Sequence, residues 1–152
     1  MADAPHVMIV EAPYYAHIAA ELARGAIQAL DAAGASYERF TVPGAFEIPA
    51  AIRIAIEGRG TGRRRFDGYI ALGCVIRGET THYDYVCAES ARGLQQLAVQ
   101  YGVAIGYGIL TVENEAQALT RAKVERKNKG GEAARACLAM IELRHQFGLQ
   151  RP

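Results

Sequence analysis

The sequence predicts one α/β domain over residues 1–152, a three-layer sandwich in which helices cover both faces of a four-stranded parallel sheet. Three observations support this prediction. Four short apolar runs of strand length alternate with stretches whose apolar residues recur at helical spacing. Glycine, proline and polar residues separate these segments, as is typical of turns. The chain shows neither an internal repeat nor a linker that would divide it.

The first strand is predicted at His6 to Glu11, because this short run is almost entirely apolar. The helix that follows has an apolar stripe at Ile18, Leu22, Ala26, Leu30 and Ala33. Gly34 is expected to end this helix. Alternating residues from Ser36 to Val42 predict the second strand. After the turn at Pro43-Gly44, the spacing of isoleucines predicts a helix over Ala45 to Glu57.

The basic stretch from Gly58 to Arg65 is expected to be a surface loop. The apolar run after it is rich in residues that suit a buried parallel strand. Lys127 to Gly131 is expected to interrupt the last two helices. The remaining elements are predicted at Tyr69–Ile76 (strand), Val86–Tyr101 (helix), Val103–Leu110 (strand), Glu115 to about Glu125 (helix) and Ala134–His145 (helix).

Right-handed crossovers between successive strands place helices on both faces of the sheet. We expect the strand order 2-1-3-4, the commonest doubly wound arrangement at this size. Ligands of such sheets bind where the direction of winding changes, here between the first and third strands. The loops Ala12–Ala16 and Arg77–His82 flank that point in this order, with Val42–Glu47 nearby.

Composition excludes several classes of protein. A formal net charge of +1 does not favour nucleic acid or an anionic membrane surface as a partner. No apolar run approaches the ~20 residues of a membrane span, and the short acidic start is unlike a signal peptide. Three cysteines without framework spacing indicate a reducing compartment, so a cytoplasmic location is expected. No spacing of cysteine or histidine predicts a metal site.

The turn after the third strand is predicted to bind a single phosphate. Gly73 to Thr80 has the outline of a P-loop, but Glu79 stands where the P-loop lysine is required. A carboxylate there would repel a nucleoside triphosphate. Backbone N–H groups at a helix amino end, together with the hydroxyls of Thr80 and Thr81, still suit one phosphate. The alternative is that one of these threonines only caps the helix.

Three further side chains are candidates because of their positions at strand ends. His82 follows the phosphate turn, where it could take a proton near pH 7, or it is simply a polar surface residue. Glu47 could accept hydrogen bonds from a polyol, or it only favours the start of a helix. Tyr14 could stack on a flat ring, or it covers an edge of the core.

Four segments stand in order along the chain: Val42–Pro49, Gly73–Cys87, Gly108–Asn114 and Asn128–Glu132. They resemble the corresponding segments of the 6,7-dimethyl-8-ribityllumazine synthase family, and the likeness extends roughly from Val7 to Phe147. That family has a flavodoxin-like sheet of the kind predicted above.

The resemblance implies an enzyme of riboflavin biosynthesis. Its two small-molecule substrates are 5-amino-6-ribitylamino-2,4(1H,3H)-pyrimidinedione and 3,4-dihydroxy-2-butanone 4-phosphate, and it releases phosphate and water without a cofactor or a metal. The resemblance assigns proton transfer to His82 and stacking on the pyrimidine to Tyr14. It places the ribityl chain on Ala45, Phe46 and Glu47, the heterocycle on Cys74, Val75 and Ile76, and the butanone phosphate on backbone groups of Glu79 and Thr80.

The resemblance also implies a site shared between subunits of a homo-oligomer. Tyr107 and Lys129 would reach the pyrimidine and ribityl groups from the neighbouring subunit, and Arg121 would pair with the phosphate. We expect a homopentamer, with face-to-face pairs of pentamers as the alternative. This expectation rests on the segment Lys123 to Lys127, which has no glycine and should follow a smooth, helix-compatible path between the last two helices.

Two other hypotheses remain open from the sequence. A flavin- or lumazine-binding paralogue would keep the site with little synthase activity, and Tyr14 followed by Tyr15 could favour it. An electron carrier or receiver domain would share the fold. A receiver requires several acids after the first strand, where this chain offers only Glu11.

Overall fold

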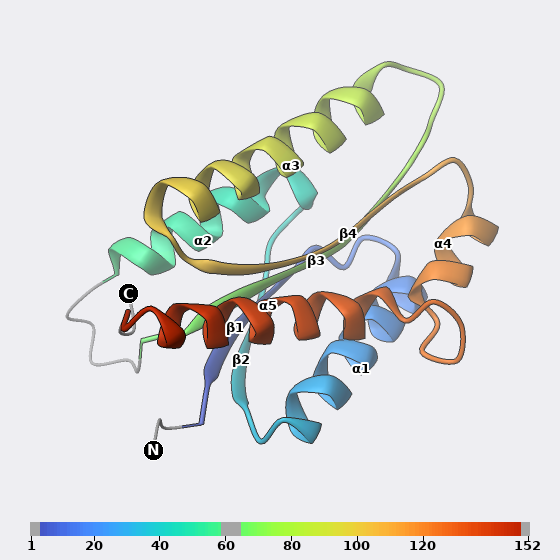
Figure 1. Ribbon diagram of the computed structural model, residues 1–152. Coiled ribbons are helices and arrows are strands. Elements are labelled where there is room, and N and C mark those ends of the chain that lie inside the picture. Colours follow the sequence, from blue (N-terminus) through green and yellow to red (C-terminus); the bar gives the residue numbers. More distant parts are fainter. Residues whose placement is uncertain (1–3, 59–64, 150–152) are drawn as a thin grey trace.

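The computed structural model describes residues 4–58 and 65–149 of the chain. Within them, four parallel strands form one sheet in the order β2-β1-β3-β4, so the predicted sheet and strand order are confirmed (Figure 1). The strands are β1 (His6–Glu11), β2 (Ser36–Thr41), β3 (Gly68–Ile76) and β4 (Ala104–Val112). Most of the predicted basic loop, residues 59–64, lies outside the described residues.

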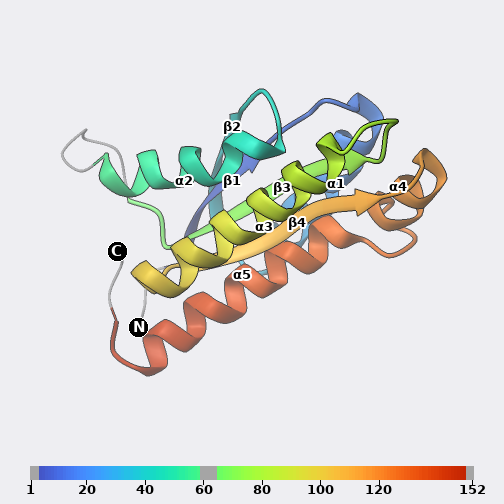
Figure 2. The same cartoon turned by 90° about the horizontal axis from the view of Figure 1, so that it is seen from above.

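Helices cover both faces of the sheet and give the three predicted layers (Figure 2). One face carries α1 (Ala16–Ala32), α4 (Glu115–Ala122) and α5 (Lys129–Gln146). The other face carries the short 3₁₀ helix η1 (Ala45–Glu47), α2 (Ile48–Glu57) and α3 (His82–Tyr101).

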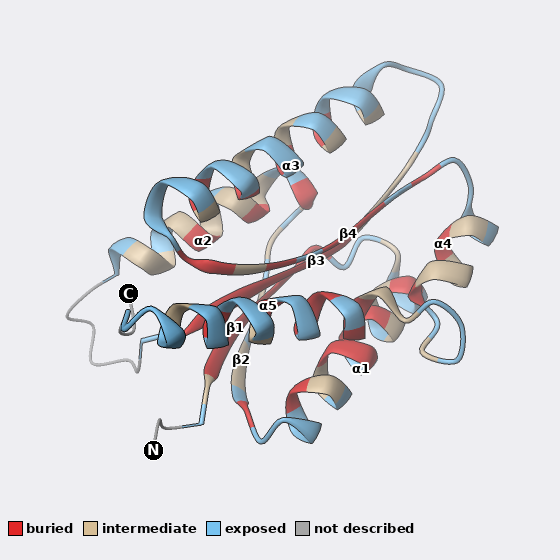
Figure 3. Ribbon diagram, in the orientation of Figure 1, coloured by how far each residue is buried: buried red, intermediate tan, exposed pale blue. Residues whose placement is uncertain are grey.

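Strand β1 lies inside the sheet and is buried along its whole length (Figure 3). Its side chains alternate between two apolar cores, as the period of two along a strand requires. Val7 and Ile9 pack on the side of α1 and α5, whereas Met8 and Val10 pack on the side of α2 and α3. This double burial explains why β1 reads as a continuous apolar run.

Helix α5 lies very close to β4, and a glycine makes this contact possible. A Cβ atom placed on Gly106 would lie 2.0 Å from the carbonyl oxygen of Ala133, which is far inside van der Waals contact. The glycine in this strand therefore allows the backbone of α5 to approach closely.

The predicted helix boundaries near the end of the chain are wrong in two places. Helix α4 ends at Ala122 rather than near Glu125, and α5 begins at Lys129, inside the predicted interruption. The expected helix-compatible path over Lys123 to Lys127 is also wrong, because Lys123 has a ψ of 130°, residues 124–127 form turns and Asn128 has a φ of 47°. The backbone N–H groups of Arg126 and Asn128 both donate to the carbonyl of Lys123 and close the turn on itself.

Two further observations concern the chain as a whole. In the described part of the chain, no helix combines the length and the apolar character that crossing a membrane requires. Cys137 is buried in the core, Cys74 and Cys87 are half-buried, and all three are free thiols.

Candidate active site

A cleft of about 550 Å³ opens at the carboxyl edge of the sheet, between the ends of β1 and β3. This is the predicted point where the winding changes, since α1 leaves β1 on one face and α3 leaves β3 on the other. Four segments of the chain meet around it. The lining residues are Ala12, Tyr14, Tyr15, Gly44, Ala45, Phe46, Glu47, Cys74, Val75, Ile76, His82, Tyr85 and Val86.

The loop after β1 supplies two aromatic side chains. Tyr14 is 78% exposed, and its ring meets that of Tyr15 edge to face, with centroids 4.9 Å apart. Partial burial raises the pKa of the Tyr15 hydroxyl above its usual value, so that group stays uncharged near neutral pH. The exposed face of Tyr14 is therefore available to a flat ligand, supported from the side by Tyr15.

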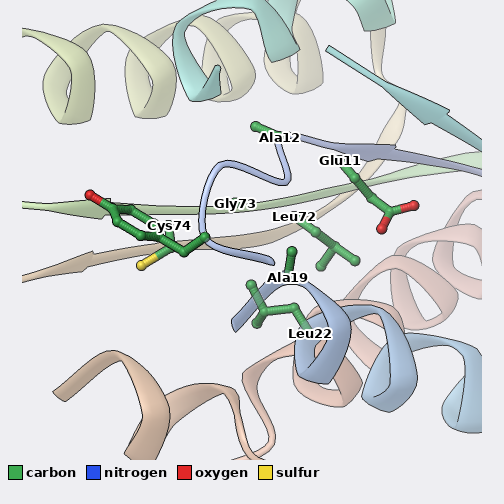
Figure 4. Close-up of a pocket in the computed structure, with 8 residues that line it drawn as sticks. Glu11, Ala12, Ala19, Leu22, Leu72, Gly73 and Cys74 are labelled. Atoms are coloured by element: carbon green, nitrogen blue, oxygen red, sulfur yellow. The ribbon is translucent and has the colours of Figure 1, made fainter. Parts of the chain in front are cut away.

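A second, much smaller cavity lies behind the cleft, between β1, β3 and α1 (Figure 4). Ala19 and Leu22 of α1 and Leu72 of β3 line it, and its volume is only about 10 Å³. It has room for about one water molecule at most. The space for a substrate therefore lies in the larger cleft.

The carboxylate of Glu11 does not serve the cleft. It is 5% exposed and accepts two hydrogen bonds from Arg39, at 2.7 Å from Nε and 2.9 Å from Nη2. This bidentate pair ties the end of β1 to β2. A receiver domain needs several free acids at the end of its first strand. Here Glu11 is the acid at the end of β1, and Arg39 already binds its carboxylate.

The segment after β2 places a carboxylate at the junction of η1 and α2. Phe46 is 56% exposed, Ala45 is buried, and both line the cleft with Glu47. Glu47 occupies the cap position of α2, yet its side chain makes no capping hydrogen bond. Because no capping bond holds it, the carboxylate is available to a ligand as well as to the positive end of the helix dipole.

The end of β3 presents backbone groups to the cleft. Pairing between β1 and β3 ends at Leu72, whereas pairing between β3 and β4 continues to Ile76. Residues 74–76 are half-buried, and within the described residues no strand lies beside their β1-facing edge. Backbone donors and acceptors on that edge need partners, which suits a heterocycle with amide-like edges.

Cys74 contributes its thiol to the same wall in an unreactive form. Burial, with a smaller effect from Cys87, raises the pKa of Cys74 to about 11. A thiol with this pKa is protonated near neutral pH and is a poor nucleophile. Its place in the wall therefore indicates packing rather than covalent catalysis.

The turn after β3 leads into α3 and to His82. Thr81 is the cap residue but makes no side-chain capping bond, while Thr80 Oγ1 accepts a hydrogen bond of 3.3 Å from the backbone N–H of His82. Glu79 and Thr80 are exposed, and His82 lines the cleft. The imidazole of His82 makes no hydrogen bond to another described residue. Its two nitrogen atoms are therefore available to a ligand.

Arg77, the cation nearest to this turn in sequence, is already engaged. Its guanidinium forms ion pairs with Glu113 at 2.9 Å and Asp84 at 3.2 Å and lies over the ring of Tyr83. No lysine or arginine is among the described residues that line the cleft. A phosphate group bound at the turn would therefore need a cation from elsewhere.

Three predicted site residues do not line the cleft of their own chain. Tyr107 lies on β4 with its side chain 44% exposed, and it is not among the lining residues. Arg121 donates to the carbonyl oxygen of Gln117 on its own helix, at 3.1 Å. Lys129 pairs with Glu132 at 3.1 Å. The remaining predictions concern groups at the cleft itself or, for Glu79 and Thr80, in the adjoining turn.

Five lining residues were not predicted as site residues: Ala12, Tyr15, Gly44, Tyr85 and Val86. A signal for two of them was present in the sequence. Tyr85 and Val86 follow His82 by three and four residues, so they share its face of α3. Ala12, Tyr15 and Gly44 lie in loops that were predicted to flank the site, but which residues of those loops face the cleft depends on the folded chain.

Among the described residues, no group of three or more histidine, cysteine, aspartate or glutamate side chains is placed to hold a metal ion. The arrangement instead combines aromatic surface, exposed backbone, one carboxylate and one imidazole. Such a cleft can bind a planar polar ring with a hydroxylated chain and move protons on it.

Comparison with known proteins matches this chain to one family by its sequence profile and by individual relatives. Residues 4–145 match the sequence profile of 6,7-dimethyl-8-ribityllumazine synthase. The chain is 57% identical over 144 residues to the protein of that name from Sphingopyxis alaskensis, covering 95% of this chain and 98% of the relative. It is 54% identical over 146 residues to 6,7-dimethyl-8-ribityllumazine synthase 1 of Rhizobium meliloti, with 96% and 95% coverage. The protein of that family from Bartonella tribocorum is 54% identical over 151 residues, with 99% and 97% coverage.

Proposed function

The chain belongs to the 6,7-dimethyl-8-ribityllumazine synthase family, and from this premise we propose that its cleft catalyses the synthase reaction of riboflavin biosynthesis. The reaction condenses 5-amino-6-ribitylamino-2,4(1H,3H)-pyrimidinedione with 3,4-dihydroxy-2-butanone 4-phosphate and releases phosphate and water. The observation that carries the proposal is the shape of one cleft. It gathers an exposed tyrosine, an unpaired strand edge, a carboxylate and an imidazole, and the imidazole follows directly on the turn before α3.

Each part of the pyrimidine substrate has a partner in this cleft. We assign stacking on the ring to Tyr14 and hydrogen bonding of its polar edge to the backbone of residues 74–76. The ribityl hydroxyls donate to Glu47, beside Ala45 and Phe46. Holding two substrates in one orientation supplies a large part of the acceleration expected for a condensation.

The butanone phosphate is assigned to the turn before α3. Backbone N–H groups of Glu79 and Thr80 hold its phosphate, assisted by the amino end of the helix. His82 then moves protons during imine formation and during elimination of the phosphate. No step of this scheme requires a cofactor.

The phosphate charge is balanced, in this proposal, by Arg121 of a neighbouring subunit. The lack of a lysine or arginine among the described lining residues supports this assignment. Tyr107 and Lys129 likewise act on the pyrimidine side of the neighbour's site. All three lie outside the cleft of their own chain, as a shared site requires.

Arg121→Ala is expected to raise the KM for the butanone phosphate about thirtyfold or more, because a charge-assisted contact to the phosphate is lost. The KM for the pyrimidine should change by less than about threefold, since that substrate carries no phosphate. Steady-state kinetics with each substrate varied in turn measure both values. Equal effects on the two substrates would show that Arg121 has a structural role instead.

We propose that the protein is a cytoplasmic homopentamer. A head-to-tail contact that closes on itself produces a ring, and a ring is what a site shared with the next subunit needs. Light scattering on the purified protein should give a mass of about five chains. About ten chains would indicate paired pentamers, and a monomer that is fully active would refute the shared site.

The overall proposal is tested by mixing both substrates with the purified protein and following lumazine absorbance and fluorescence. Turnover that depends on both substrates is the expected result. Tight binding of riboflavin with negligible turnover would instead identify a binding paralogue.

A further inference from the structure

We propose that Glu21 and Arg24 of α1 are positioning residues. They hold the turn between α4 and α5 (residues 123–128) in place, and thereby hold Arg121 in place for the active site of the neighbouring subunit. This inference rests on the proposed function of Arg121. It concerns two residues outside the cleft, joined to the turn by a network of hydrogen bonds and ion pairs about a hundred residues away in sequence.

The network starts within α1. Arg24 donates to Glu21 through Nε at 2.9 Å and through Nη2 at 3.0 Å, a bidentate pair one helical turn apart. Such a pair fixes the plane of the guanidinium before it meets a third partner.

The same guanidinium then reaches across to the turn. Its Nη2 donates to both carboxylate oxygens of Glu125, at 2.9 and 3.1 Å. Glu21 makes a second connection, because its Oε1 accepts a hydrogen bond of 3.3 Å from the backbone N–H of Val124. Two consecutive residues of the turn are thus held by α1: Val124 through its backbone N–H and Glu125 through its carboxylate.

Both carboxylates of the network are ionised at neutral pH. The hydrogen bonds from Arg24 hold the pKa of Glu21 and of Glu125 below their ordinary values. Nevertheless, the side chains of Arg24 and Glu125 are 41% and 70% exposed. Ion pairs this exposed contribute little to global stability. We therefore expect these ion pairs to affect the position of the turn more than the free energy of unfolding.

The two ends of the turn are held differently. At the α5 end, Gly130 packs so closely on α1 that a Cβ atom would lie 2.0 Å from the carbonyl oxygen of Leu22. That end, with Lys129, is held by backbone packing. At the α4 end, Lys123 leaves helical geometry with a ψ of 130°, and the contacts that tie Val124 and Glu125 to α1 come from Glu21 and Arg24. Arg121 lies beside this second end, on the last turn of α4, a helix that packs into the core through Ala118 and Ala122.

Loss of the network should consequently displace Arg121 more than Lys129. Misplacement of a binding group by even 1 Å weakens its contribution strongly, because charge-assisted contacts depend on distance and direction. The effect should appear at the phosphate and not at the pyrimidine.

The test is Arg24→Gln in the full-length protein. The KM for the butanone phosphate is expected to rise about three- to tenfold, while kcat, the KM for the pyrimidine and the oligomeric mass stay within about twofold. In an Arg121→Ala background, the same change should have no further effect on the KM for the butanone phosphate. Dependence of one substitution on the other is the signature of residues that act through each other.

Arg92→Gln is the matched control. Arg92 pairs with Glu89 at the same spacing of three residues on α3, and its hydrogen bonds stay within that helix. It should leave both KM values unchanged. If Arg92→Gln raised the KM for the butanone phosphate by a similar factor, loss of any such helical ion pair would have this effect, and the inference would be overturned.

The remaining outcomes separate the inference from the proposed function. If Arg121→Ala selectively affects the butanone phosphate but Arg24→Gln does not, the positioning role is refuted and the proposed function stands. An Arg24→Gln effect that persists in the Arg121→Ala background, or affects both substrates equally, refutes it as well. If Arg121→Ala itself shows no selectivity, the phosphate assignment falls, and the inference falls with it.

Discussion

Replacement of His82 by alanine is expected to lower kcat by about one to three orders of magnitude, the range usual for loss of a general acid–base group. The imidazole stands at the amino end of α3, lines the cleft and makes no hydrogen bond to another described residue. Both imine formation and phosphate elimination need a proton to be moved at this place. Stopped-flow or steady-state absorbance of the lumazine product measures the loss.

The fold should survive this change, because the His82 side chain is exposed and supports no core contact. Far-ultraviolet circular dichroism and the melting temperature should match those of the unchanged protein. His145→Ala is the control, since His145 is an exposed residue near the distant end of α5. A His82→Ala protein with unchanged kcat would remove the imidazole from the mechanism.

Gly130→Ala is expected to destabilise the protein by about 3 kcal/mol, at the upper end of the usual cost of overpacking. The added Cβ would lie 2.0 Å from the Leu22 carbonyl oxygen and 2.8 Å from its carbon. Both are backbone atoms, so no side chain can turn aside, and α1 and α5 would have to separate. The melting temperature should fall by about 10 °C at fixed protein concentration.

Gly78→Ala provides the comparison for stability. A Cβ atom on Gly78 would meet nothing within 4 Å. Its melting temperature should stay equal or rise slightly, because alanine restricts the unfolded chain more than glycine does. Equal destabilisation by both substitutions would show that the close approach of α1 and α5 does not limit stability.

The main elements of the fold could be read from the sequence because the physical signals are local. The residues of β1 are buried on both faces, so the sequence shows an uninterrupted apolar run from Val7 to Val10 within the predicted strand His6–Glu11, which is also the observed strand. Right-handed crossovers then leave few strand orders, and the predicted one is observed. Because ligands bind at one edge of such a sheet, Tyr14, Glu47 and His82 could be predicted to meet before the structure was known, and all three line the cleft.

The availability of individual groups could not be read in the same way. In sequence, Arg77 is the cation closest to the phosphate turn, but Glu113 and Asp84 hold it in ion pairs. The open edge of residues 74–76 results from the different lengths of two strand pairings. Both facts depend on which distant residues become neighbours.

The sequence by itself determined the order of strands and helices, the edge of the sheet where the site lies, and the family. Only the tertiary structure decided the path from α4 to α5. Residues 123–127 contain no glycine, and helix propensity alone favours their continuing a helix, but each such preference is only a fraction of a kcal/mol per residue. Hydrogen bonds donated by Arg24 and accepted by Glu21, together with the close packing of Gly130 on Leu22, act on this segment from about a hundred residues away. Contacts over that distance in sequence outweigh local propensity, because they form only when the whole chain has folded.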